Sequence, residues 1–271
     1  MTNVKWLLDS QGLGEDLSLL TEEIKKQGMD YKVVKCNPFL EDIYCEYNDK
    51  DCVVSYGTIN FINQIKHKPW TPNIWLTEDQ FRCTKYYSYY GKYLINQDYT
   101  FIPYSEFVRR RHYWQPVLSD MEIFIRPDSN MKTFNGMALN SMYKLEDYCY
   151  DKIDPDTLVI VAPYKKILYE WRFIVVDRQV ITGSQYKKNG RKDINPYCPE
   201  GAAFMAQEIA NEEWMPDSVF VIDIGMTCDH IGLIEIGSFN CAGLYGCDRS
   251  KIVEYVSKVA IKEYDEIHRT L

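Results

Sequence analysis

The sequence predicts a protein of two parts, a small α/β layer at the N-terminus followed by an α+β region. In the first 65 residues, short apolar runs rich in β-branched residues alternate with segments of helical spacing. After residue 120, paired apolar runs joined by short polar turns become the dominant pattern. Pro116 stands between the two patterns, so we predict domains at 1–117 and 118–271.

The N-terminal part has the order strand, helix, strand, strand, helix, which is typical of a layer built on a parallel sheet. The predicted strands and helices, in chain order, are 4–8, 16–26, 31–36, 51–55 and 59–65. We expect a loop at 68–72, an aromatic helix or loop at 86–93 and a helix with a connector at 101–114. Gly12 and Gly14 lack the third glycine of a dinucleotide-binding fingerprint.

The residue pattern of the second part predicts more strands than helices. Strands are expected at 121–126 and 158–162, and hairpins at 170–182 and 219–236. Helices are expected at 137–150, at 201–211 and from Asp248 onwards. The segment 184–199 is polar and rich in lysine, so we expect a mobile loop that closes over a ligand or remains a solvated surface loop.

Two carboxylates stand in the apolar runs of the hairpin that begins at Val219. If Asp223 lies opposite Leu233, Glu235 faces the same side of the sheet two positions further along. Asn240 follows and adds an amide oxygen. Two carboxylates and an amide at one sheet edge suit Mg²⁺ bound together with a polyphosphate. The alternative for either carboxylate alone is a half-exposed strand residue paired with lysine or arginine.

Cations and an apolar linker precede this hairpin. Arg126 ends a predicted strand, and Lys132 lies in the polar loop 127–136, an arrangement that can cover a triphosphate. Residues 159–164 run from an apolar strand into an open linker, which can hold an adenine ring. Glu170 and Arg172 share a face of the next strand. The alternative for Arg126 is a surface ion pair, and the alternative for Glu170 and Arg172 is an ordinary cross-strand ion pair.

Composition excludes several function classes. The formal net charge of −8 argues against general nucleic-acid binding, which requires an excess of lysine and arginine. The nine cysteines show no C-x-x-C spacing, so we expect reduced core thiols in a cytoplasmic protein. No apolar run approaches the length of a membrane span, and we expect no membrane partner.

Three motifs give this chain a family resemblance. They read F-I-R-P-x(5)-K-T-F-x-G, E-W-R-F-I-V followed by G-S-Q-Y-K, and F-N-C-A-G-L-Y. Their order resembles the ATP-grasp superfamily, and most closely its phage and bacterial clade marked by one arginine and two lysines. The resemblance covers residues 121–250. It implies a pre-ATP-grasp-like α/β domain followed by a two-lobed ATP-grasp domain, located in the cytoplasm, or in the host cytoplasm if phage-encoded.

The resemblance also implies roles for individual residues. Phosphate contacts would come from Arg126 and Lys132, and contacts to phosphates or an acyl intermediate from Arg172 and Lys187. Mg²⁺ would be held by Asp223 and Glu235, with Asn240 replacing the family's metal-site asparagine, because Gly237 stands at that position. The remaining cofactor-binding positions are the adenine-lining residues Val161, Ala162, Pro163 and Tyr164, and Glu170 at the head of the following hairpin.

The implied reaction is ATP- and Mg²⁺-dependent ligation of a carboxylate to an amine or thiol through an acyl phosphate. Its substrates would be small molecules or peptides that carry these groups. The alternative is a nucleotide-binding interaction protein without turnover, which Gly237 favours. Neither the substrates nor the oligomeric state follows from the sequence.

Overall fold

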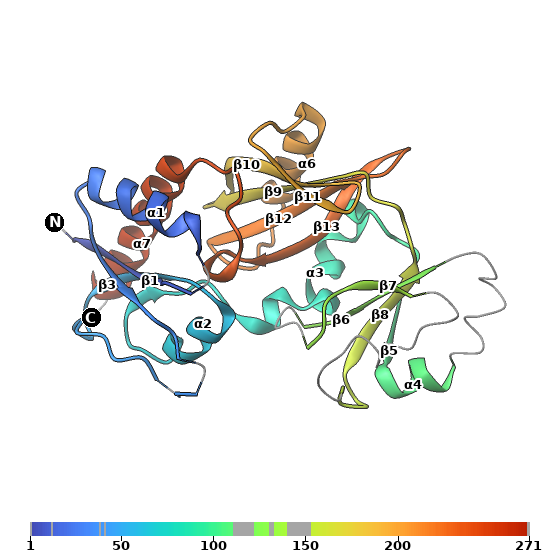
Figure 1. Ribbon diagram of the computed structural model, residues 1–271, viewed down its shortest axis with the longest axis horizontal. Coiled ribbons are helices and arrows are strands. Elements are labelled where there is room, and N and C mark those ends of the chain that lie inside the picture. The colour runs from blue at the N-terminus through green and yellow to red at the C-terminus, as the bar shows by residue number, and fades with distance from the viewer. Residues whose placement is uncertain are drawn as a thin grey trace.

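A computed structural model describes residues 2–11, 13–37, 39–40, 42–110, 122–129, 133–139 and 153–269. These residues form three sheets (Figure 1). A four-stranded N-terminal sheet has the order β2-β1-β3-β4, a five-stranded central sheet has the order β11-β10-β9-β12-β13, and a third sheet has the order β5-β8-β6-β7. No helix of the described segments is long and apolar enough to cross a membrane.

The N-terminal sheet is parallel throughout, as its strand and helix order predicted. Its elements are β1 (Val4–Asp9), α1 (Glu15–Lys26), β2 (Asp30–Val34), β3 (Cys52–Tyr56), α2 (Ile59–Ile65) and β4 (Thr71–Asn73). β4 forms where a loop was predicted. β4 lies at the edge of the sheet, so no strand follows it that would need a hydrogen bond from the backbone N–H that Pro72 lacks.

The two faces of this sheet carry different helices. Leu7 of β1 packs in the cluster that contains Ile62 of α2, whereas Trp6 and Leu8 pack with α1 and with α7 (Arg249–Arg269). The Trp6 indole Nε1 donates a hydrogen bond to Ser257 Oγ of α7 at 3.1 Å. The last helix therefore completes the first layer, and both ends of the chain lie beside it (Figure 1).

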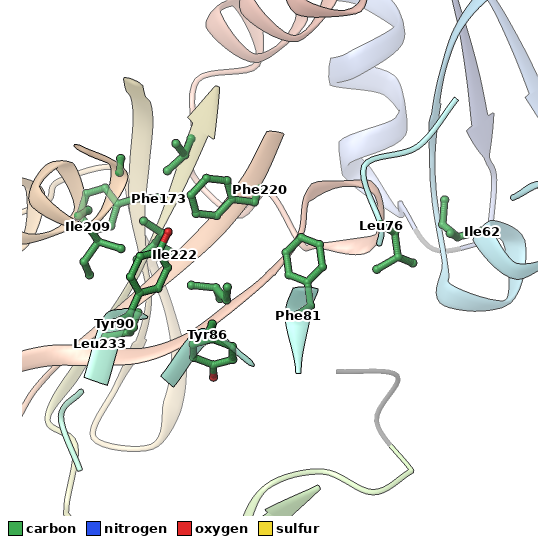
Figure 2. Packing of buried hydrophobic residues seen from close by; sticks show 14 of the residues in the cluster. Ile62, Leu76, Phe81, Tyr86, Tyr90, Phe173, Ile209, Phe220, Ile222 and Leu233 are labelled. Carbon is green, nitrogen blue, oxygen red and sulfur yellow. The ribbon is translucent and has the colours of Figure 1, made fainter. Parts of the chain in front are cut away.

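The central sheet is antiparallel. Its elements are β9 (Tyr169–Val176), β10 (Gln179–Lys188), β11 (Arg191–Asn195), β12 (Val219–Met226) and β13 (Ile231–Ser238), with α6 (Glu200–Asn211) between β11 and β12. One face is apolar along its length: Phe173, Phe220 and Ile222 pack against α6 and α3 (Cys83–Tyr90) (Figure 2). Full burial of each such side chain stabilises the fold by about 1.5–3 kcal/mol.

The prediction of a mobile loop at 184–199 was wrong for most of this segment. β10 continues to Lys188, and β11 returns through a turn in which Asn189 and Gly190 have φ of 49° and 75°. Asn-Gly with both φ values positive is the two-residue turn that matches strand twist. All five residues of β11 are exposed, so the strand has no apolar alternation that its sequence could reveal.

The third sheet joins segments from both predicted domains. Its elements are β5 (Thr100–Pro103), α4 (Tyr104–Arg109), β6 (Ile123–Pro127), β7 (Met137–Leu139) and β8 (Leu158–Pro163). The predicted helix at 101–114 begins instead with β5, which pairs with β8. The predicted helix at 137–150 begins with β7, which pairs with β6, and its residues 140–150 lie outside the described residues, as does Pro116.

Three short 3-10 helices complete the described secondary structure. They are η1 (Glu78–Phe81), η2 (Gly91–Tyr93) and η5 (Phe239–Cys241). The connector after η2 contacts the central sheet, where Leu94 forms a parallel bridge with Leu233 of β13. Because this connector leads directly into β5, it lies between the central and the third sheet.

Candidate active site

A cleft of about 700 Å³ lies between the third sheet and the central sheet. Its walls come from β6 and β8 on one side and from β9, β10, β12 and β13 on the other, with the connector after η2 between them. Described parts of the polar loop 127–136 also line it, including Phe134 and Gly136. A Cβ on Gly136 would lie 2.9 Å from the Phe124 ring, so any larger residue would require this ring to shift where the loop approaches β6.

The cleft-facing side of the central sheet is divided along its length. Ile174 and Val221 lie at one end, where they pack in the cluster that contains α7. Arg172, Asp223 and Glu235 lie at the other end and line the cleft. Side chains two positions apart on a strand share a face, so one surface is apolar under α7 and polar in the cleft.

Asp223 and Glu235 are direct cross-strand partners in β12 and β13. Ile224 pairs with Leu233, so a bulge leaves Ile234 as an extra residue between the two pairs. The predicted pairing of Asp223 with Leu233 was therefore wrong by two positions. The predicted outcome, both carboxylates on one face, is confirmed because a shift of two residues preserves the face.

Each carboxylate of the cleft is paired with a cation. The Arg172 guanidinium donates from Nε and Nη2 to the two oxygens of Asp223 at 2.8 and 2.7 Å. Arg126 Nη2 lies 3.0 Å from Glu235 Oε2, and Lys187 Nζ lies 3.1 Å from Glu170 Oε1. The bidentate pair is buried, with Asp223 only 1% exposed, so loss of either partner would leave an uncompensated charge.

Burial raises the pKa of the Asp223 carboxyl, and Glu235 and Glu170 raise it further, whereas Arg172 lowers it. Burial also raises the pKa of the Tyr186 phenol, an effect that Asp223 and Glu170 reinforce. Tyr186 therefore remains protonated and donates to Glu170 Oε2 at 2.6 Å. A divalent cation beside these carboxylates would reverse the upward shift of the Asp223 pKa, because it stabilises the ionised form.

Sequence patterns did not identify Tyr186 and Tyr245 as site residues. Their rings stack at 4.8 Å between centroids, and the Arg172 guanidinium lies 5.5 and 5.2 Å from them. Arg172 Nη1 also donates to Gly243 O at 3.2 Å. These contacts hold the guanidinium in place, and both tyrosines lie within the quoted motifs G-S-Q-Y-K and A-G-L-Y.

A second bulge explains why Tyr186 and Lys187 lie on the same face of β10. The β10 register shifts between Gln185 and Lys187, and Lys187 pairs with Glu170 of β9. As a result, the consecutive side chains of Tyr186 and Lys187 both reach Glu170, which regular alternation would forbid. The bulges at Tyr186 and at Ile234 therefore both lie at the cleft end of the central sheet.

The predicted adenine-lining residues are only partly in the cleft. Ala162 and Tyr164 line it, as does Lys165. Val161 faces the opposite side of β8 and packs in the cluster with Ile125, because alternate strand residues point to opposite faces. Pro163 is absent from the lining, and its carbonyl oxygen accepts a hydrogen bond from Asn96 Nδ2 at 2.7 Å.

Asn240 does not join the carboxylates, contrary to the sequence-based prediction. Its Oδ1 accepts a hydrogen bond from the Trp75 backbone N–H at 2.7 Å, and its Nδ2 donates to Ser55 O at 2.6 Å. The side chain is fully buried and connects η5 to the N-terminal layer. Lys132, predicted to contact phosphate, lies outside the described residues. Across the described ranges, no group of three or more His, Cys, Asp and Glu residues could hold a metal.

Residues 108–255 match the model of an ATP-grasp domain, family 2 of the clade named for one arginine and two lysines. The chain belongs to this family. No curated protein sequence matches the chain. The clade is the one that the arginine and lysine motifs predicted, and the fold class is confirmed.

Solved structures extend the likeness to nearly the whole chain. A RimK domain protein ATP-grasp from Sphaerobacter thermophilus is 10% identical, with a TM-score of 0.60 and coverage of 94% of this chain and 99% of that one. D-alanyl-alanine synthetase A from Vibrio cholerae is 12% identical, with a TM-score of 0.59 and coverage of 97% and 99%.

A RiPP-associated ATP-grasp ligase from Chryseobacterium gregarium was solved with ADP and a leader and core peptide. It is 11% identical, with a TM-score of 0.55 and coverage of 96% of this chain and 97% of that one. These likenesses show that the chain has the fold of ATP-grasp ligases.

Proposed function

We propose that this protein is an ATP- and Mg²⁺-dependent ligase that joins a carboxylate to an amine or thiol. The observation that carries the proposal is one cleft in which Asp223 and Glu235 lie opposite each other, surrounded by Arg126, Arg172 and Lys187. Carboxylates for a cation and cations for phosphates occupy the same cavity in a member of the ATP-grasp family.

The donor set fits Mg²⁺ bound together with a nucleotide. Mg²⁺ is usually held by one or two carboxylates plus substrate phosphates. Asp223 and Glu235 would supply the carboxylates, and the bound ion would neutralise charge on the phosphates. The Asn240 amide is engaged elsewhere, and Gly237 has no side chain that could bind the ion. Arg172 and Arg126, which now pair with these carboxylates, would then be available to phosphate oxygens.

The proposed reaction has two steps. A carboxylate oxygen of the first substrate attacks the γ-phosphorus of ATP, the bond to the β,γ-bridging oxygen breaks, and ADP leaves. The amine nitrogen or thiol sulfur of the second substrate then attacks the acyl carbon, releases inorganic phosphate and loses its proton. Arg126, Arg172 and Lys187 would position the phosphates and stabilise the charge on them, as would Lys132 in the adjoining loop.

The substrate class extends from small molecules to peptides. The solved structures with a similar fold include a D-alanyl-alanine synthetase and a ligase bound to a leader and core peptide. This supports substrates whose carboxylate and amine belong either to small molecules or to peptides. Cys36, Cys52, Cys83 and Cys247 are buried free thiols, which supports the expected cytoplasmic location. A phage or bacterial origin, as the clade implies, remains part of this proposal.

A nucleotide-binding protein without turnover is the second candidate. Gly237 favours it, because the family's metal-site asparagine is absent and Asn240 does not replace it. Binding and turnover therefore need separate measurements. Thermal unfolding with ATP, with and without Mg²⁺, tests binding. A hundredfold excess of ligand over its Kd should raise the free energy of unfolding by about 2.7 kcal/mol.

Two neighbouring lysines provide a matched test of the site. Lys187 lines the cleft, whereas the adjacent Lys188 lies outside its lining and packs over the Tyr169 ring. Lys187→Met should weaken ATP binding, and Lys188→Met should leave it unchanged. Release of ADP and phosphate that depends on a pool of amino acids or peptides would establish ligation. Binding without such release would support the second candidate, and no stabilisation at millimolar MgATP would exclude both.

A further inference from the structure

Asn96, in the connector between η2 and β5, contributes a polar group to the cleft. Its Nδ2 donates to the Pro163 carbonyl oxygen at 2.7 Å. That oxygen can only accept a hydrogen bond, so the amide is oriented with Nδ2 toward Pro163 and Oδ1 away from it. The contact fixes which of the two side-chain atoms is available for another partner.

The Asn96 Oδ1 atom is buried and has no hydrogen-bond partner within the described structure. The neighbouring Ile95 carbonyl, in contrast, is already engaged by Lys165 Nζ at 3.0 Å and contacted by His230 Nε2 at 3.1 Å. A buried acceptor without a partner is costly, and such atoms in binding sites are candidates for a ligand donor. Asn96 therefore offers one unused acceptor beside the linker that follows β8.

Part of the wall of the same cleft is apolar. Leu94, Ile160, Ala162 and Ile234 line it from three different segments. The cations Arg126 and Arg172 also line the cleft, on β6 and β9. An apolar slot with a hydrogen-bond acceptor suits a flat aromatic base that carries an amino group, joined to an anionic tail.

We propose that Asn96 Oδ1 accepts a hydrogen bond from the exocyclic amino group of adenine and thereby selects ATP over GTP. The inference rests on the proposed function, because it assumes a purine nucleotide in this cleft. Guanine carries a carbonyl oxygen at the corresponding ring position, so two acceptors would face each other. Asn96 precedes residues 108–255, so base selection comes from a segment outside the matched family domain.

The test compares nucleotides that differ by one group. Dissociation constants for ATP, purine riboside triphosphate, which lacks the amino group, and GTP are measured with Mg²⁺ by calorimetry. The wild-type protein should bind ATP about tenfold more tightly than either analogue, the effect of one hydrogen bond to a buried acceptor. Asn96→Leu should remove the difference between ATP and purine riboside triphosphate.

Gln97→Leu is the matched control. Gln97 is an exposed amide whose Nε2 contacts the Lys92 and Leu94 carbonyls, and it does not line the cleft. This variant should keep the tenfold preference. Equal affinity of the wild-type protein for ATP and for purine riboside triphosphate would overturn the role of Asn96 but not the proposal that the protein binds nucleotides. This outcome can be read from the wild-type protein alone, so it does not depend on whether Asn96→Leu folds. Absence of binding by all three nucleotides would overturn the proposed function as well.

Discussion

Asn240 connects two sheets, and Asn240→Ala should lower the free energy of unfolding substantially. The substitution removes the acceptor of the Trp75 N–H and the donor to the Ser55 carbonyl, at 2.7 and 2.6 Å. Leaving a buried polar group unsatisfied costs about 1–3 kcal/mol, so two groups cost about 2–6 kcal/mol. For a chain of this size, that corresponds to a fall in Tm of about 5–15 °C.

Urea denaturation followed by tryptophan fluorescence measures this loss, because Trp75 is itself at the contact. Asn60→Ala, an exposed substitution on α2, is the control and should change stability by less than about 1 kcal/mol. In the fraction of the Asn240→Ala variant that remains folded, the Mg²⁺ dependence of ATP binding should be the same as in the wild-type protein. Wild-type stability together with weakened Mg²⁺ dependence would refute the structural role and restore Asn240 as a metal ligand.

Three further predictions follow from the site and its surroundings. Glu235→Gln removes a charge from the cleft but keeps an oxygen, so the protein should fold and lose Mg²⁺-dependent turnover; full activity per folded molecule would count against a metal role. Burial raises the pKa of Asp217 to about 7. The folded state therefore binds the proton more tightly than the unfolded state, and stability should fall as pH rises from about 4 to about 7, by at most about 1.4 kcal/mol per unit. Asp217→Asn should flatten this dependence and be more stable than wild type at pH 8 in chemical denaturation; an identical pH profile would contradict it. Trypsin should cleave the hairpin at 187–192 slowly even without nucleotide, because its backbone is held in β10 and β11. Rapid cleavage that MgATP suppresses would show that the hairpin opens and closes.

Much of the site could be predicted because its residues interrupt apolar strands. Asp223 and Arg172 stand out as charges within apolar runs, and the structure pairs them in adjacent strands. Their occurrence in the sequence indicates a polar site before any contact is known, since unpaired charges are rarely buried. The parallel N-terminal layer was predictable for a similar reason, because its strands and helices have clear and different periods.

The remaining errors come from features that have no local signal. The bulge in β10 lets the consecutive residues Tyr186 and Lys187 both face the cleft, although period-two alternation places neighbouring side chains on opposite faces. Asn240 lies a few residues beyond Glu235, but the chain turns into η5 and sends the amide to the N-terminal layer. Asn96 belongs to a connector whose position depends on the bridge between Leu94 and Leu233, a contact between segments far apart in sequence.

The packing of α7 on β1 also has a consequence for biosynthesis. Trp6 and Leu8 are translated more than 240 residues before their partners on α7. Until then, one apolar face of the N-terminal sheet has no helix α7 to cover it. Exposed apolar surface on a nascent chain promotes aggregation and recruits chaperones. We therefore expect ribosome-bound chains that stop before residue 249 to retain the N-terminal layer in a protease-sensitive state, and protection to appear only when α7 has emerged.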